Sequence, residues 1–104
     1  MKETVTFVTC RDAREARRLA RALVSDRLAA CVNVVPGVLS VYRWKGKLET
    51  GREVLLLVKS RAALSRRLVA RVRELHSYQV PETVSVPIVA GNEDYLRWLR
   101  ESTR

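Results

Sequence analysis

Residues 38–59 read VLSVYRWKGKLETGREVLLLVK, two apolar runs around a charged centre. The runs at 38–44 and 53–59 are rich in β-branched, aromatic and aliphatic residues, and the segment between them, 45–52, contains two glycines. This pattern predicts a long β-hairpin with an exposed, charged loop at its tip. Residues 55–58 are apolar without alternation, which indicates a central strand covered on both faces.

An amphipathic helix is predicted on each side of the hairpin. Before it, Asp12 and Glu15 resemble a capping box, and apolar residues then recur at helical spacing until the helix ends near Leu28. After it, Ser60 can cap a second helix that ends near His76. In both helices the arginines fall largely on positions that face solvent.

Further elements complete the pattern. Pro36 and Gly37 stop or bend the strand before the hairpin, and Pro87 indicates a sheet edge or a bulge, because proline cannot donate to a sheet ladder. Asn92 is typical of the cap of a short last helix with acidic residues in its first turn. The additional strands are predicted at 4–10, 30–35 and 83–89.

The order of these elements is βαββαβ followed by a C-terminal helix. It predicts a ferredoxin-like α+β sandwich in which both longer helices cover one face of an antiparallel sheet. The 104 residues fit a single domain, 1–104, and 47% hydrophobic residues are enough for a folded core. Because the other sheet face also needs cover, we expect neighbouring subunits to supply part of it.

The chain is strongly basic. Its 20 Lys and Arg residues outnumber 11 Asp and Glu residues, which gives a formal net charge of +9. A nucleic acid is the alternative partner that this charge suggests, but solvated helix faces explain the scattered arginines better. An RNA-recognition sheet also needs aromatic residues on its third strand, and 53–59 has none. No nucleic-acid partner is expected.

The sequence gives no sign of a membrane segment or a secretion signal. No apolar run approaches the ~18 residues of a membrane span, and residues 1–5 lead directly into a strand. Cys10 and Cys31 are the only cysteines and are not spaced as a CxxC motif, which favours a reducing compartment. We therefore expect a cytoplasmic protein.

Few residues could carry chemistry. His76 is the only histidine, so a metal site must combine it with cysteine, carboxylates or another subunit. Cys31 or Cys10 could supply a soft thiolate for Cu(I) or Zn(II). The structural alternatives are a histidine that caps a helix end and a buried thiol that packs as a small hydrophobe. Neither glycine-rich phosphate motif is present and no nucleophile–histidine spacing is convincing, so no enzyme is predicted.

Several short segments with distinctive residues follow one another along the whole chain: 28–33 (LAACVN), Pro36-Gly37, 40–47 (SVYRWKGK), 53–59 (EVLLLVK), 76–78 (HSY) with Pro81-Glu82, and Gly91-Asn92 with 95–98 (YLRW). Together they resemble the CutA family of divalent-cation-tolerance proteins. Ser77 and Thr83 depart from the family, which usually has proline and an aliphatic residue there.

The resemblance implies a ferredoxin-like subunit in a homotrimer, with the hairpin strands running between subunits. It also implies binding of copper or another divalent cation, with Cys31 and His76 as the ligands put forward, and no organic cofactor. We further expect polar residues of the hairpin and the following loop either to line a cleft between subunits or to lock the trimer: Ser40, Tyr42, Trp44, Glu53, Lys59, Tyr78 and Glu82.

Two functions are compatible with this resemblance. In the first, the protein is a non-enzymatic trimer of the divalent metal ion response that binds the ion weakly and helps cells tolerate it. In the second, it is a signalling or adaptor trimer, similar to the P-II regulators, that takes an anionic small molecule at the clefts and a protein partner at the hairpin tips. The first function requires Cys31 or His76 to face a site, and the second requires a basic cleft.

Overall fold

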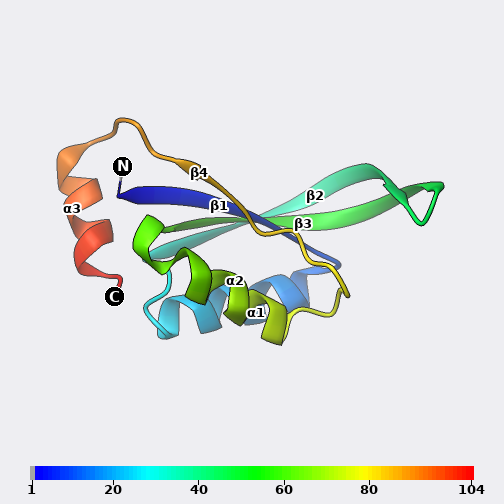
Figure 1. The fold of residues 1–104 in the computed structure, drawn as a ribbon, viewed down its shortest axis with the longest axis horizontal. Helices are drawn as coiled ribbons and strands as arrows, with labels where there is room; N and C mark the ends of the chain where they lie inside the picture. Colours follow the sequence, from blue (N-terminus) through cyan, green and yellow to red (C-terminus); the bar gives the residue numbers. More distant parts are fainter. Residues whose placement is uncertain (1) are drawn as a thin grey trace.

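Four antiparallel strands form one sheet, and two helices cover one of its faces (Figure 1). The structure, a computed structural model, describes residues 2–104. The strand order β2-β3-β1-β4 is that of the predicted ferredoxin-like sandwich, which is confirmed. The elements are β1 (Glu3–Cys10), α1 (Ala13–Ser25), β2 (Cys31–Trp44), β3 (Lys47–Arg61), a 3₁₀ turn (Ala62–Leu64), α2 (Ser65–Leu75), β4 (Val84–Pro87) and α3 (Glu93–Glu101).

The core lies between the sheet and the helices α1 and α2. Alternate residues of β1 and β3 point to this side and are buried, because successive side chains of a strand point to opposite faces. Leu19 and Leu23 of α1 and Leu68 and Val72 of α2 pack against them. The buried sheet residues of this core are Val8, Cys10, Val54, Leu56 and Val58.

The strands β2 and β3 continue beyond the helices as a two-stranded hairpin, at the right of Figure 1. Only Lys45 and Gly46 form its turn, and both have positive φ, 50° and 78°, as a tight two-residue hairpin turn requires. The prediction of a loop over residues 45–52 is therefore wrong for residues 47–52, which form a strand paired with residues 39–44. No residue of 47–52 is buried, so burial selects no apolar face that would reveal a strand in the sequence.

Replacing Gly46 with alanine is expected to lower the free energy of unfolding by about 1 kcal/mol, because a residue with a Cβ is strained in this left-handed conformation. Gly51 of the same hairpin provides the control, since its φ is not positive and an added Cβ would make only an ordinary contact, 3.9 Å from the Tyr42 hydroxyl. Urea unfolding of the two alanine variants should separate them. Equal midpoints would contradict the two-residue turn.

Two predicted boundaries shift for physical reasons. Of the two effects predicted for Pro36 and Gly37, a stop or a bend, the bend is confirmed, because β2 continues through Pro36 with a bulge between Val35 and Val38. It is an edge strand, where a residue without an N–H is tolerated. The helix α1 ends at Ser25 rather than near Leu28, which belongs to the turn that leads into β2.

Ser60 does not cap the second helix as predicted. It belongs to β3, where its hydroxyl donates a hydrogen bond to the Leu28 carbonyl, 2.6 Å away in the core. A 3₁₀ turn follows, and α2 begins only at Ser65. Asn92 does cap α3, because its side chain accepts from the Asp94 N–H. A serine after an apolar run is thus compatible with either a helix cap or a buried strand end.

The face of the sheet opposite α1 and α2 stays largely uncovered within one chain, since α3 packs at one end (Figure 1). The strand β4 lies at an edge, as Pro87 indicates, but is shorter than predicted. Its Val84 and Val86 are 54% and 40% exposed on the open face. None of the helices in residues 2–104 combines the length and hydropathy that crossing a bilayer requires.

Candidate functional site

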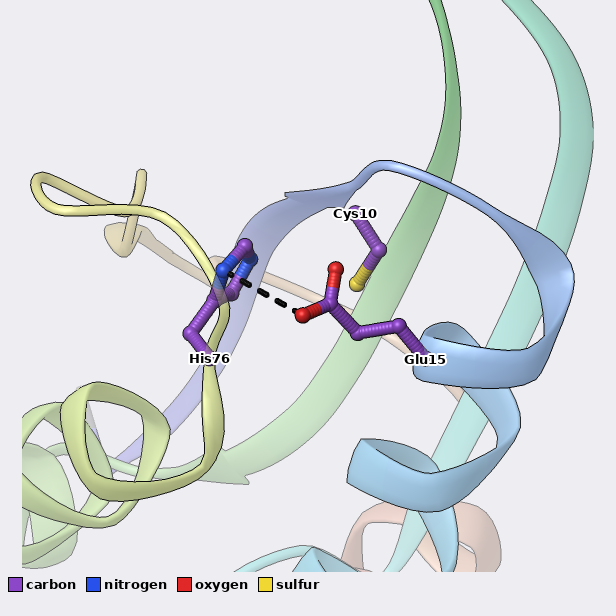
Figure 2. Close-up of side chains that lie close together, drawn as sticks. All are labelled: Cys10, Glu15 and His76. Atoms are coloured by element: carbon purple, nitrogen blue, oxygen red, sulfur yellow. Dashed lines mark ion pairs between the residues drawn. The ribbon is translucent and has the colours of Figure 1, made fainter.

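A cluster of metal-ligating residue types lies where the sheet meets the helices (Figure 2). Cys10 ends β1, Glu15 lies in the first turn of α1, and His76 directly follows α2; all three are buried. Their ligand atoms lie within 4.8 Å of one another. Their capacity to hold an ion depends on the partners that these atoms already have.

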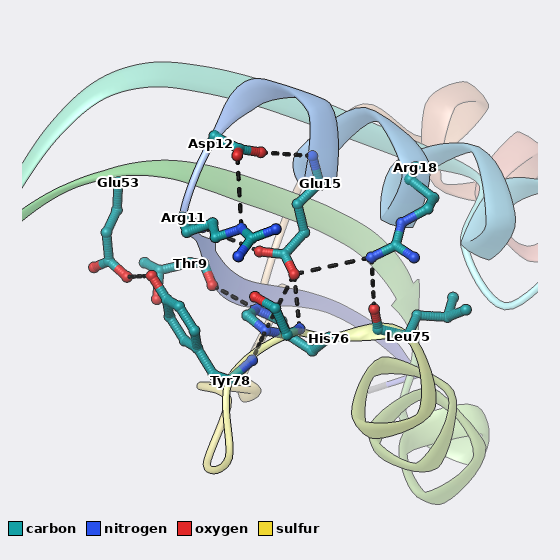
Figure 3. A network of polar contacts seen from close by, with 10 residues as sticks. Thr9, Arg11, Asp12, Glu15, Arg18, Glu53, Leu75, His76 and Tyr78 are labelled. Atoms are coloured by element: carbon teal, nitrogen blue, oxygen red, sulfur yellow. Dashed lines mark hydrogen bonds and ion pairs between the residues drawn. The ribbon is translucent and has the colours of Figure 1, made fainter.

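Both ring nitrogens of His76 have a backbone partner (Figure 3). The Tyr78 N–H donates to Nδ1 at 3.0 Å, and Nε2 lies 2.8 Å from the carbonyl oxygen of Thr9. Because an N–H donates to Nδ1, the ring proton lies on Nε2 and is donated to Thr9. The ring therefore has no lone pair free for a metal ion.

The Glu15 carboxylate accepts hydrogen bonds from backbone N–H groups just before α1 and just after α2. Its Oε1 accepts from the Arg11 N–H at 3.1 Å, and its Oε2 accepts from the Ser77 N–H at 2.7 Å. Burial acts to raise the pKa of this carboxyl, but the hydrogen bonds from Ser77 and Arg11 outweigh it, so the pKa lies below its usual value. A charged carboxylate thus ties the start of α1 to the loop after α2.

Cys10 completes the cluster as a neutral thiol. Burial and the neighbouring Glu15 and Glu53 carboxylates raise the pKa of this thiol to about 12. Since the thiolate is the form that binds metals, Cys10 is poorly suited as a ligand. Glu15 and His76 therefore act as a structural connection between α1 and the loop after α2, which we call the Glu15–His76 lock.

The structure does not bring Cys31 and His76 together. Cys31 pairs with Lys59, and through it with Val5, whereas His76 binds Thr9, four residues further along β1. At ~3.3 Å per residue, these positions are roughly 13 Å apart along the sheet. The side chains also lie on opposite faces, because His76 faces the helices and Cys31 shares the open face with Lys59. The predicted pair of ligands is not formed within one chain.

Sequence analysis identifies Glu15 as a capping residue but not as a buried charge. Its position on the apolar stripe of α1 is nevertheless a signal that its carboxylate is buried. Half of the capping box forms, since the Asp12 side chain accepts from the Glu15 N–H. Glu15 also lies four residues before Leu19 and eight before Leu23, on the apolar stripe of α1. A carboxylate on such a stripe needs polar partners, and the sequence does not reveal that these are backbone N–H groups.

A cleft of about 820 Å³ lies between the hairpin and the loop after α2. All but one of the residues predicted to gather at a cleft do so within one chain, from β2, β3 and the loop after α2: Ser40, Tyr42, Trp44, Glu53, Tyr78 and Glu82. The remaining lining residues are Thr9, Val41, Glu49, Gln79 and Val80. The hairpin and the loop thus form two walls of one hollow.

Tyr78 connects the lock to the cleft (Figure 3). Its backbone N–H donates to His76, and its hydroxyl donates to Oε2 of Glu53 at 2.7 Å. Burial and the Glu53 carboxylate raise the pKa of the Tyr78 hydroxyl, so it remains a proton donor. The lock therefore sets the position of one wall of the cleft.

Two residues change their predicted relation to the cleft. Lys59 is not part of it, because it lies six residues from Glu53 along β3, roughly 20 Å, and its ammonium donates to the Asn33 side chain. Glu49 does line the cleft, directly opposite Tyr42 in the register of the hairpin. The sequence conceals Glu49 because its segment reads as a loop.

The cleft is acidic although the chain is basic. Most acidic side chains form ion pairs with arginines. Within residues 2–104, the side-chain carboxylates without an ion pair are Glu49, Glu53, Glu82 and Glu101, and the first three line the cleft. No lysine or arginine of residues 2–104 lines it. Within the described residues of one chain, this cleft has none of the basic lining that the P-II-like function needs at a cleft between subunits, and its carboxylates attract cations.

Comparisons with known proteins agree over almost the whole chain. The divalent-cation tolerance protein CutA of Thermus thermophilus is 50% identical over 101 residues, which cover 97% of this chain and 98% of that protein. Protein CutA 1, chloroplastic, of Oryza sativa is 47% identical over 100 residues. The match covers 96% of this chain but only 56% of the rice protein.

Solved structures superpose closely on this fold. The Thermus thermophilus protein has a TM-score of 0.96, with 98% of this chain and 99% of that chain covered. The periplasmic divalent cation tolerance protein CutA of Archaeoglobus fulgidus has a TM-score of 0.93 at 33% identity, with 96% and 97% covered. Residues 4–102 match the family model described as CutA1 divalent ion tolerance protein. The chain therefore belongs to the CutA1 divalent ion tolerance family.

Proposed function

We propose that the protein is a non-enzymatic divalent-cation tolerance protein that binds its ion weakly at the acidic cleft. The observation that carries this proposal is the gathering of Glu49, Glu53 and Glu82, without ion pairs, in a chain with 20 basic and 11 acidic residues. Carboxylates in a hollow create a negative potential that concentrates cations. The family name agrees with such a ligand.

The donor atoms of the cleft favour an ion that keeps part of its water shell. Carboxylate and hydroxyl oxygens suit hard cations, and for a given set of ligands Cu²⁺ binds more tightly than the other divalent first-row ions. In the described part of the chain, the only group of three such ligand atoms within 4.8 Å is that of Cys10, Glu15 and His76. An ion in the cleft would therefore contact one or two carboxylates and keep part of its water shell.

Titration with Cu²⁺ tests the cleft, and Trp44 is its reporter. Trp98 of α3 lies outside the cleft, so Trp98→Phe leaves a single tryptophan in it. We expect saturable quenching of Trp44, weakened about tenfold in Glu49→Gln/Glu82→Gln because two attractive charges are lost. Glu101→Gln, which removes a carboxylate outside the cleft, should have no effect.

Two outcomes would count against this site. Equal Cu²⁺ affinity in the double glutamine variant and its parent would remove the carboxylates from the binding reaction. A loss of affinity in Cys31→Ser would move the ion to the thiol on the open face, where ligands from another chain must complete the site.

We also propose that the protein forms a homotrimer, supported by its exposed apolar surface. Leu39, Val41 and Leu48 are 62%, 62% and 71% exposed and share one face of the hairpin. Contact with neighbouring subunits would bury this patch and part of the open sheet face. Sedimentation equilibrium should give three times the chain mass of 11.9 kDa. A wild-type mass of one chain would contradict the trimer, and Leu39→Lys/Val41→Lys should shift the mass toward one chain.

The proposed location is the cytoplasm. Cys10 and Cys31 are both free thiols, which suits a reducing compartment. Fractionation of cells that express the untagged chain tests this location, and recovery with a secreted or organellar marker would contradict it.

A further inference from the structure

The acidic cleft also has aromatic walls. Tyr42 and Trp44 line it from β2, and Tyr78 lines it from the loop after α2. In the single chain Tyr42 and Trp44 are 46% and 40% exposed, so their rings are accessible. A metal ion that binds through oxygen atoms gains nothing from such rings. An organic cation does, because the face of an aromatic ring attracts an ammonium group.

The carboxylates are spread over the cleft rather than gathered at one point. Glu49 lies on the hairpin opposite Tyr42, Glu53 lies four residues along β3, and Glu82 belongs to the opposite wall. No three ligand atoms of these side chains lie within 4.8 Å of one another. Separate carboxylates can each pair with one charge of a ligand that carries several separate positive charges.

The cleft is large enough for a small molecule as well as for an ion. Its volume of about 820 Å³ lies within the usual range for small-molecule sites. An ammonium group of the protein itself already lies near one of its rings, since Nζ of Lys45 is 5.9 Å from the centroid of Trp44. The Trp44 ring can therefore be approached by an alkylammonium group at the distance typical of cation–π contacts.

We propose that the cleft binds an aliphatic polyamine, an organic cation with two or more ammonium groups joined by methylene chains. The ammonium groups bind the separate carboxylates Glu49, Glu53 and Glu82, and the methylene chain lies against Tyr42 and Trp44. The inference rests on the proposed cation-binding role of the cleft and names a second class of cation for it. Such a ligand and a divalent metal ion compete for the same carboxylates.

Calorimetric titration at fixed ionic strength tests the proposal, with spermidine, 1,4-diaminobutane and butylamine as probes. Butylamine has the same carbon chain as the diamine but one charge. We expect saturable binding of spermidine and at least about tenfold weaker binding of butylamine, because it leaves carboxylates unpaired. Tyr42→Leu should weaken spermidine about three- to fivefold through loss of a cation–π contact.

The variants separate this proposal from the proposed function. Glu49→Gln/Glu82→Gln spares Glu53 and its bond to Tyr78, and should weaken both kinds of cation. Cu²⁺ binding that depends on these carboxylates, without saturable binding of spermidine, would overturn the polyamine site alone. Spermidine binding without Cu²⁺ binding would overturn the metal role alone. The polyamine site would also be overturned if butylamine and 1,4-diaminobutane bound with equal affinity and Tyr42→Leu left spermidine affinity unchanged. Binding would then be nonspecific charge attraction.

Discussion

Replacing His76 with alanine is expected to lower the free energy of unfolding by about 3 kcal/mol, which corresponds to a fall of roughly 15 °C in the thermal midpoint. The substitution leaves the Tyr78 N–H and the Thr9 carbonyl without their partner and opens a cavity at a fully buried side chain. Urea and thermal unfolding, followed by circular dichroism at one fixed chain concentration, measure the loss.

A metal ligand and a structural residue behave differently in this experiment. A histidine that only bound an ion could be removed with little loss of stability, and Cu²⁺ affinity would fall. Here His76→Gln should recover part of the stability, because its amide has both a donor and an acceptor. Glu74→Ala, an exposed change in the last turn of α2, should stay within about 0.5 kcal/mol of wild type. Wild-type stability of His76→Ala would show that the lock does not form.

Glu15→Gln is expected to cost about 2 kcal/mol at pH 7, because an amide cannot accept from both the Arg11 and the Ser77 N–H. It should also flatten the acid side of the stability profile. The pKa of Glu15 in the folded chain lies below its usual value of 4.5, so its contribution is present above pH 4.5 and is lost as the pH falls through the folded pKa. The variant has no carboxyl to protonate there.

Unfolding measured between pH 7 and pH 3 tests this linkage. Some acid loss should remain in Glu15→Gln, because a hydrogen bond from Arg100 also holds the pKa of Glu3 below its usual value. Combining Glu15→Gln with His76→Ala should cost less than the sum of the single variants, since both act on the same junction. An acid profile identical to that of wild type would show that Glu15 is not held as a charged acceptor.

The order of elements could be predicted from the sequence because burial leaves a clear pattern. In α1 the apolar stripe includes Leu19 and Leu23, and in β3 the run 55–58 indicates a central strand. The outer hairpin could not be delimited, because it projects beyond the helices and solvent imposes no alternation on 47–52. Its turn residues, Lys45 and Gly46, are recognisable only once that pairing is known.

The candidate site was partly predictable for a similar reason. Polar residues set in apolar surroundings, such as Glu53 and Tyr78, mark places where partners are needed, and these two do bind each other. Sequence spacing does not say which residues meet in three dimensions. Cys31 and Lys59 therefore fall at a different part of the sheet from the cleft, while Glu49 enters it through a strand register that a loop assignment conceals.

The two prolines on the edge strands limit how sheets of two copies of this protein can pair edge to edge. Pro36 lies on β2 and Pro87 on β4, the two edges of the sheet, and neither has an N–H to donate to an added strand. Open-ended growth into a fibre would meet a missing hydrogen bond at each edge. Past the bulge, residues 38–44 of β2 keep their N–H groups. Strand addition is thus directed to the hairpin, which favours small closed assemblies over aggregation.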